Sequence, residues 1–208
     1  MPTALIVGAT GLIGRHLTEQ LLRSEVYTAV RTLVRRRTDL VHPKLTQTLI
    51  DFNDLSAQVV PFQGDTLFCA LGTTRAKAGS KAAFYTVDFT YAYAVARMAR
   101  EQGVRHFSLV SSVGADARSA SFYLKTKGEL EEAVQGLGFE RLHIFRPSFL
   151  LGDRGEFRPL EVLGGGVMQV FAPLLGKYAP VQAQAVAEEM IRASLDRTPG
   201  SRFFSFGR

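Results

Sequence analysis

The feature of this sequence that most constrains its fold is an apolar segment leading directly into three regularly spaced glycines. Residues 4–7, Ala-Leu-Ile-Val, precede a Gly-x-x-Gly-x-x-Gly pattern. Leucines then recur at helical spacing, so the segment predicts a strand, a tight turn and a helix. Glycine permits positive φ and close approach of a ligand, and the first N–H groups of a helix suit a pyrophosphate. We therefore expect a phosphate-binding turn formed by Gly8, Thr10, Gly11, Leu12, Ile13 and Gly14.

The remainder of the chain alternates strand-type and helix-type segments. We expect strands at residues 29–34, 44–50, 65–70, 106–112, 142–145 and 203–206, and helices at 12–25, 80–102, 119–137 and 183–195. Such alternation predicts an α/β fold with a doubly wound, Rossmann-type parallel sheet. A chain of 208 residues suits a single domain. Within 1–208 we expect a cofactor-binding core at 1–151 and a small substrate or closing region at 152–208.

The end of the second predicted strand bears on which dinucleotide the turn would hold. In dinucleotide-binding folds an acidic residue here contacts the adenosine ribose of NAD, whereas an arginine accommodates the 2′-phosphate of NADP. This chain has Arg35 and Arg36 at that point and no carboxylate until Asp39. A guanidinium matches a phosphate in a bidentate fork, so these residues favour NADP(H) over NAD(H). A solvated basic loop is the alternative.

Two further strand ends are expected beside the same cofactor. The third predicted strand ends at Asp51 and Phe52, where position places the pair beside the adenine. Asp51 could instead cap the helix-type segment that follows, and the two roles are compatible. The fourth strand runs into a small polar turn at the carboxyl edge of the sheet, which in such folds lies over the cofactor. The residues expected there are Leu71, Gly72 and Thr73.

A tyrosine and a lysine carry the candidate chemistry. Tyr123 and Lys127 lie four residues apart, which puts both on one face of the predicted helix. That helix follows a strand ending in Ser111 and Ser112, at the edge that faces the cofactor. An adjacent ammonium favours a phenolate and so lowers a tyrosine's pKa, as general acid–base catalysis near neutral pH requires. A serine could hold the substrate oxygen during hydride transfer, and Lys127 could hydrogen-bond the nicotinamide ribose.

Several segments together resemble the short-chain dehydrogenase/reductase superfamily. They are the glycine turn, Ser111-Ser112-Val113-Gly114, Tyr123-x-x-x-Lys127 and Arg146-Pro147-Ser148-Phe149-Leu150-Leu151-Gly152. More narrowly, the segment at residues 69–79 and Phe145-Arg146-Pro147 look like the atypical branch that contains a Tat-interacting, NADPH-binding regulator and its bacterial relatives.

That resemblance implies a Rossmann fold, NADP(H) binding with Pro147 beside the cofactor, and a Ser-Tyr-Lys catalytic site. The site maps onto Ser112, Tyr123 and Lys127, and Ser112 is preferred because it directly precedes Val-Gly. One position departs from the family pattern. Where many members carry an asparagine that supports a water-mediated proton path, this chain has Asp88. Either Asp88 substitutes for the asparagine or the relay is weakened, which would fit the regulatory members of the branch.

Two functions therefore stay open. The first is an NADP(H)-dependent oxidoreductase acting on a small carbonyl or alcohol. The second is an NADP(H)-binding regulatory or redox-sensing protein with little turnover. The mostly apolar residues 157–181 favour an apolar substrate or a protein partner, although they could simply complete the core. A serine hydrolase is disfavoured because the chain has no Gly-x-Ser-x-Gly elbow.

Composition limits the other classes. The formal net charge is +6, but the basic residues are mostly dispersed, with one dense run at residues 35–37, and no aromatic-plus-basic platform accompanies them, so we expect no nucleic-acid partner. No apolar run approaches the roughly 18 residues of a membrane span. The lack of a signal peptide and the single cysteine, Cys69, favour a cytoplasmic location. We expect no metal site, because the His and Cys spacings match no known pattern, and either a monomer or a homodimer.

Overall fold

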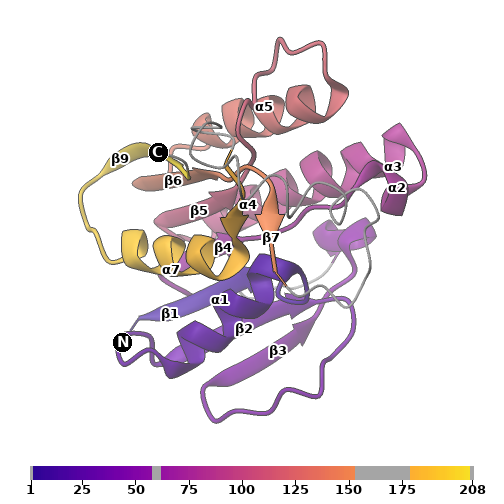
Figure 1. Ribbon diagram of the computed structural model, residues 1–208. Helices are drawn as coiled ribbons and strands as arrows, with labels where there is room; N and C mark the ends of the chain where they lie inside the picture. Colours follow the sequence, from indigo (N-terminus) through magenta and orange to yellow (C-terminus); the bar gives the residue numbers. More distant parts are fainter. Residues whose placement is uncertain (1, 58–61, 153–178, 207–208) are drawn as a thin grey trace.

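The computed structural model describes residues 2–57, 62–152 and 179–206, whose strands form a seven-stranded parallel sheet (Figure 1). The strands of this sheet are β1 (Thr3–Val7), β2 (Ala29–Val34), β3 (Leu45–Leu49), β4 (Thr66–Cys69), β5 (His106–Val110), β6 (Arg141–Arg146) and β9 (Gly200–Ser205). Their order is β3-β2-β1-β4-β5-β6-β9. The chain thus builds outward from β1 in both directions, which confirms the predicted doubly wound α/β fold. Two short strands, β7 (Leu150–Leu151) and β8 (Val181–Gln182), pair with each other.

Helices cover both faces of the sheet. On one face lie α1 (Leu12–Arg23) and α7 (Ala183–Ser194), and on the other lie α4 (Ala92–Glu101) and α5 (Phe122–Gln135) (Figure 1). The shorter helical segments are η1 (Phe52–Ala57), α2 (Arg75–Ala78), α3 (Lys81–Tyr85) and η2 (Thr86–Tyr91). Because both faces are covered, the four buried residues of β1 are apolar: Ala4 and Ile6 pack on the α1 side, Leu5 and Val7 on the α4 side.

The helix predicted at 80–102 is one helical run with an irregular centre. It consists of α3, the π-helical turn η2 and α4 in succession. The run starts after Ser80, whose hydroxyl accepts a hydrogen bond from the Ala83 N–H at 3.0 Å, and stops before Gly103, whose φ is +90°. Single π-helical turns occur frequently at functional sites. Here η2 carries Asp88, which is fully buried.

The other predicted elements are present with shifted ends. β5 ends at Val110, so Ser111 and Ser112 belong to the loop after it. α5 begins at Phe122 because the preceding Ser121 acts as its N-cap. The closing strand β9 is longer than predicted and pairs with β6 along the main sheet. Most of the apolar stretch at 157–181 lies outside the described residues.

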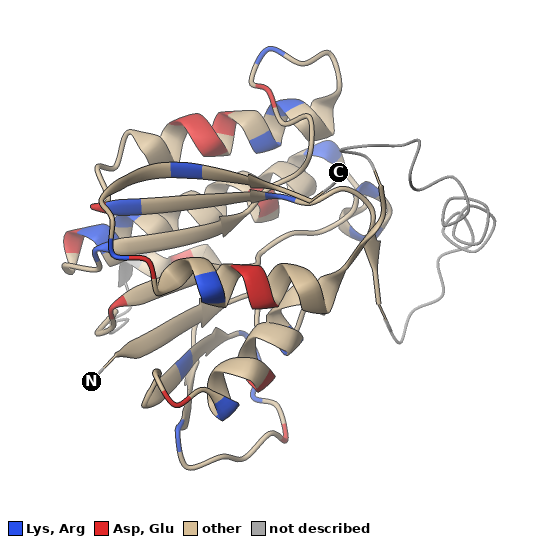
Figure 2. Cartoon of the chain, turned by 60° about the vertical axis from the view of Figure 1, so that its left-hand side comes forward, with Lys and Arg blue, Asp and Glu red and all other residues tan. Residues whose placement is uncertain are grey.

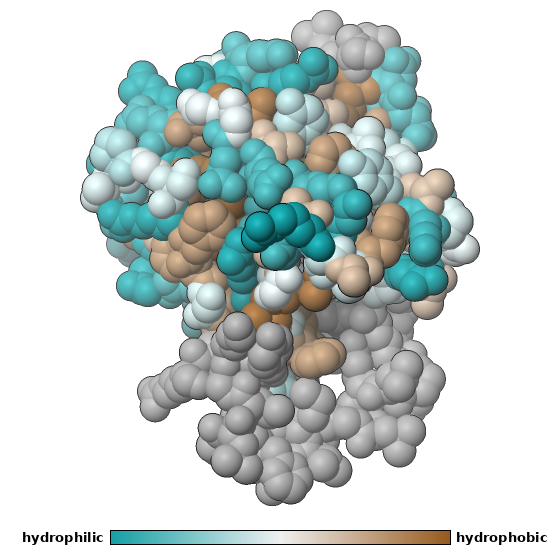
Figure 3. Space-filling model, turned by 90° about the horizontal axis from the view of Figure 1, so that it is seen from above, coloured by the Kyte–Doolittle hydropathy of each residue, from teal (hydrophilic) through white to brown (hydrophobic). Residues whose placement is uncertain are grey.

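Charged residues are spread over the surface rather than collected on one face. Figure 2 shows Lys and Arg on strands, helices and loops, with Asp and Glu between them. From the α5 side, hydrophilic residues predominate and hydrophobic ones form small separate areas (Figure 3). Among the helices within the described ranges, none combines the length and the apolar character that crossing a membrane requires.

Candidate functional site

The turn between β1 and α1 is built by close backbone contacts. Gly8 has a φ of +80°, and a Cβ at this position would lie 2.5 Å from the carbonyl carbon of Ala70. A Cβ on Gly14 would lie 2.0 Å from the carbonyl oxygen of Gly8. Glycine is therefore required at both positions, first by the turn and then by the packing of α1 against it. The Gly8 contact also places the loop after β1 against the loop after β4.

The amino end of α1 is suited to an anion. Its N-cap residue is Gly11, so no side chain caps the helix, and no acidic residue lies in its first turn. The Gly11 N–H donates to the Gly8 carbonyl at 2.9 Å, whereas the N–H groups of the first helical turn have no partner within the helix. Thr10 is exposed beside them, and Ile13 is buried beneath. These features fit a pyrophosphate held at this helix end.

The two arginines follow β2 on an ordered loop. Arg35 and Arg36 are exposed, and neither forms an ion pair with any residue that the structure describes. Gln47 of β3 fixes the loop beyond them. Its side-chain carbonyl accepts from the Thr38 N–H at 2.9 Å, and its amide donates to the Leu40 carbonyl at 3.1 Å. The sequence analysis did not identify Gln47, because no local pattern marks its role.

The predicted adenine residues have structural contacts of their own. An Asp51 carboxylate oxygen accepts from the Asn53 N–H at 2.9 Å at the start of η1, so the capping alternative is confirmed. Phe52 is buried and its ring packs on Tyr91, with the ring centroids 5.2 Å apart. Contact of either residue with an adenine stays a prediction.

Lys127 makes its closest polar contact with Asp88. The Lys127 Nζ lies 2.7 Å from Asp88 Oδ1, and the two side chains are 5% and 0% exposed. Burial alone lowers the pKa of Lys127, but the charges of Asp88 and Tyr123 outweigh it, so the pKa is raised above the usual value and the ammonium is retained. The pair is therefore a buried ion pair between α5 and the π-helical turn η2.

The same carboxylate holds the loop after β4. Asp88 Oδ2 accepts a hydrogen bond from the Thr73 N–H at 2.8 Å. A Cβ on Gly72 would lie 3.5 Å from Asp88 Oδ1 and 3.7 Å from Lys127 Nζ, so Gly72 lies directly over the pair. Leu71 is half-buried beside them. The structure thus brings the predicted Leu71, Gly72 and Thr73 together with Lys127.

Tyr123 lies one helical turn before Lys127 and remains accessible. Its residue is 37% exposed, and its ring packs on Phe84 with the centroids 5.7 Å apart. Ser111 and Ser112 are both buried after β5. The Ser112 hydroxyl donates to the Val113 carbonyl at 3.3 Å, whereas the Ser111 hydroxyl has no hydrogen-bond partner among the described residues.

Pro147 follows β6 and joins this edge of the sheet. It is buried, and its carbonyl accepts from the Val113 N–H at 2.9 Å, which ties the loop after β6 to the loop after β5. The predicted site residues from the loops after β1, β4, β5 and β6 therefore share the carboxyl edge of the sheet. Their catalytic and binding roles stay predictions.

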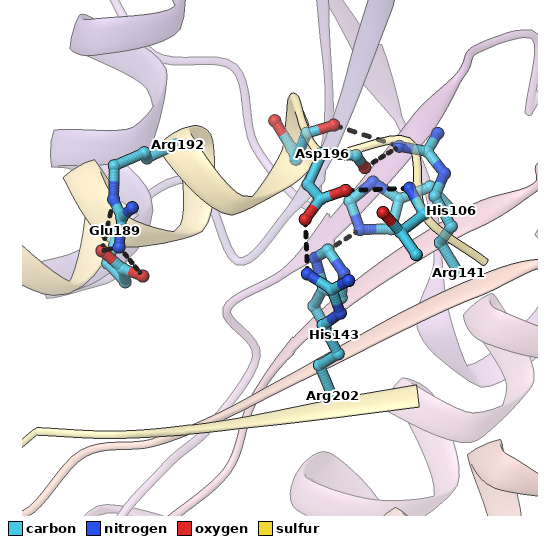
Figure 4. A network of polar contacts seen from close by, with 9 residues as sticks. His106, Arg141, His143, Glu189, Arg192, Asp196 and Arg202 are labelled. Carbon is cyan, nitrogen blue, oxygen red and sulfur yellow. Dashed lines mark hydrogen bonds and ion pairs between the residues drawn. The ribbon is translucent and has the colours of Figure 1, made fainter. Parts of the chain in front are cut away.

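A second polar cluster lies at the opposite, amino edge (Figure 4). The rings of His106 and His143 are buried and joined by a hydrogen bond between His106 Nε2 and His143 Nδ1 at 3.1 Å. Arg141 donates to the carbonyls of Ser194 at 3.1 Å and Asp196 at 2.8 Å. These bonds tie the end of α7 to the sheet. The two buried histidine rings pack inside the same cluster. Across the described parts of the chain, no group of three or more His, Cys, Asp or Glu side chains is placed to hold a metal ion.

Comparisons with known proteins agree with this arrangement. Residues 8–160 match a family described as NAD(P)H-binding. The protein HTATIP2 of Rattus norvegicus is 38% identical over 205 residues, which cover 96% of this chain and 83% of that protein. The mitochondrial protein FMP52 of Candida albicans is 35% identical over 200 residues, which cover 91% of this chain and 86% of that protein.

Solved structures share the fold. The Bordetella bronchiseptica enzyme WbmH, determined with NAD⁺, has a TM-score of 0.73 at 18% identity, with 100% of this chain and 76% of that chain covered. The UDP-glucose 4-epimerase of Thermus thermophilus, determined with NAD, has a TM-score of 0.70 at 18% identity, with 99% of this chain and 78% of that chain covered. At this level of identity the similarity shows the fold alone.

Proposed function

The chain belongs to the NAD(P)H-binding family, as an atypical short-chain dehydrogenase/reductase, and we propose that it is an NADP(H)-dependent oxidoreductase acting on a small, apolar carbonyl or alcohol. The observation that carries this proposal is the position of Lys127. This buried ammonium lies one turn from the accessible phenol of Tyr123, on the carboxyl edge that also holds the glycine turn.

The residues divide into those that hold the cofactor and those that handle the proton. The turn at residues 8–14 would hold the pyrophosphate, and Arg35 and Arg36 the 2′-phosphate. Lys127 would hold the nicotinamide ribose, and the bound nicotinamide would supply or accept hydride. Tyr123 would give its phenolic proton to the substrate oxygen, or take it back in the reverse direction, while Ser112 holds that oxygen.

Replacing one phenol tests the proposal. A panel of apolar aldehydes and ketones is assayed with NADPH, and Tyr123→Phe should reduce turnover of any substrate found by at least about 100-fold, the lower range for general acid–base catalysis. NADPH affinity should change little, because only the hydroxyl is lost. Tyr85→Phe is the matched control, since Tyr85 is a partly buried tyrosine whose ring stacks on Phe89. Equal turnover by Tyr123→Phe and wild type would rule out this mechanism.

The second candidate is a regulatory protein that binds NADP(H) with little turnover. It is favoured by Asp88, which occupies the position of the usual asparagine and engages Lys127 in an ion pair. Tight NADPH binding with no turnover across the carbonyl panel would support this candidate, and turnover that depends on Tyr123 would oppose it.

A cytoplasmic location and a monomeric or homodimeric state also stay predictions. Fractionation of cells that express the tagged chain tests the first, and light scattering of the purified protein tests the second.

A further inference from the structure

One carboxylate contacts both elements that are expected to hold the nicotinamide half of the cofactor. Asp88 Oδ1 lies 2.7 Å from Lys127 Nζ, and Asp88 Oδ2 accepts from the Thr73 N–H at 2.8 Å. Gly72 covers the pair so closely that a Cβ there would reach van der Waals contact with both charged groups. Asp88 itself is fully buried and lies behind these elements.

This contact changes the charge of the site. An asparagine at the same position would leave Lys127 as an uncompensated cation, whereas Asp88 makes the buried pair neutral. The difference matters because the nicotinamide ring is positively charged in NADP⁺ and neutral in NADPH, while the rest of the cofactor is the same in both. A buried cation nearby repels the oxidised ring, and inside a protein such interactions are screened much less than in water.

We infer that Asp88 is a positioning residue that balances the charge of Lys127, and that it thereby sets the relative affinity of the site for oxidised and reduced cofactor. The inference rests on the proposed NADP(H) site and does not require a known substrate. In the wild-type protein the affinities for NADP⁺ and NADPH therefore differ less than they would in a site that contained Lys127 without the Asp88 charge. The Asp88 carboxylate also accepts a hydrogen bond from the Thr73 N–H, so it holds the loop after β4 in place next to the ion pair.

The test is the ratio of the dissociation constants for NADP⁺ and NADPH, measured by fluorescence and calorimetric titration at pH 6. Asp88→Asn leaves Lys127 as an unpaired cation, so the affinity for NADPH relative to that for NADP⁺ should rise roughly tenfold. Lys127→Met leaves the carboxylate alone, so the ratio should shift towards NADP⁺. The double variant has no charge at either position and should return to within about threefold of the wild-type ratio. Glu129→Gln is the control, since Glu129 lies on the same helix and pairs with Lys125 at 3.9 Å.

The ratio of the two dissociation constants distinguishes a charge effect from a folding defect, because a smaller folded fraction weakens the apparent binding of both cofactors equally. If the single variants fold poorly, the double variant still provides a measurement, since it leaves no buried charge unpaired. An unchanged ratio in both single variants, or a double variant that keeps the shift of either one, would overturn the inference. Wild-type protein that binds neither cofactor would instead refute the proposed function, so the two failures are distinguishable.

Discussion

The tightest contact in the candidate site gives the sharpest prediction about its construction. Adding one methyl group at Gly14 places a Cβ 2.0 Å from the carbonyl oxygen of Gly8, 2.7 Å from its carbonyl carbon and 2.9 Å from the Cα of Ala9. All three are backbone atoms, so no side chain can rotate away. Ordinary contact begins near 3.4 Å, and the backbones of α1 and the turn must therefore separate by about 1.4 Å, the difference between the two distances.

Two effects of Gly14→Ala oppose each other. Alanine is favoured over glycine inside a helix by about 1 kcal/mol. Overpacking a well-packed site costs typically about 1–3 kcal/mol and occasionally more, and a rigid backbone overlap belongs at the upper end. We expect the overlap to win, with a net destabilisation of about 2 kcal/mol, the difference between these two effects. For a chain of this size that corresponds to a melting temperature lowered by roughly 4–8 °C.

Thermal melting and NADPH titration of the same samples check this reasoning. Gly14→Ala should melt earlier and bind NADPH at least about tenfold more weakly, because the turn proposed to hold the pyrophosphate is displaced. Gly136→Ala is the control, since Gly136 has an ordinary φ of −66° and its added Cβ would lie 3.4 Å from the nearest atom. A Gly14→Ala protein that melts at or above the wild-type temperature and binds NADPH equally well would refute the argument.

Two more predictions concern charge. Replacing Arg35 and Arg36 with alanine should weaken the binding of NADPH by at least about tenfold and the binding of NADH by much less. Arg97→Ala is the control and should change neither affinity. Equal losses of affinity for both cofactors would contradict the proposal that these arginines bind the 2′-phosphate. Burial and nearby cations lower the pKa of His106 to about 2 and that of His143 to about 4. Because the unfolded chain takes up these protons near pH 6.5 and the folded chain does not, stability should be full above that pH and fall as the pH drops from 6.5 towards the folded-state pKa values of about 4 and about 2. Urea unfolding at pH 7.5 and at pH 5 measures this loss of stability. His143→Asn should make the loss smaller. Equal stability of the wild type at both pH values would contradict the prediction.

Local signals predicted the fold because they were repeated along the chain. The apolar strand before Gly8 and the alternation that follows it leave few arrangements other than a parallel sheet. The same kind of reasoning did not reveal the π-helical turn, since residues 80–102 show ordinary helical periodicity on both sides of it. The family resemblance marked Asp88 as unusual but did not predict its contact with Lys127, because the two residues are 39 positions apart and meet only when helices pack. The hydrogen bonds of Gln47 to Thr38 and Leu40 could not be predicted either, because no local sequence pattern marks them.

Stability is a poor explanation for the Asp88–Lys127 pair. Moving two charges out of water has a large desolvation cost, and well-packed apolar residues in place of a buried ion pair are often as stable or more so. A lysine needed only for packing would therefore be better replaced by methionine. The pair is explained if the site needs a fixed ammonium next to the accessible Tyr123 phenol, because burial alone lowers the pKa of Lys127 and the charge of Asp88 raises it again. Asp88 raises the pKa of the ammonium, and its second oxygen accepts a hydrogen bond from the Thr73 N–H. One side chain thereby links the ionisation of the candidate catalytic lysine to the position of the loop that is expected to lie over the cofactor.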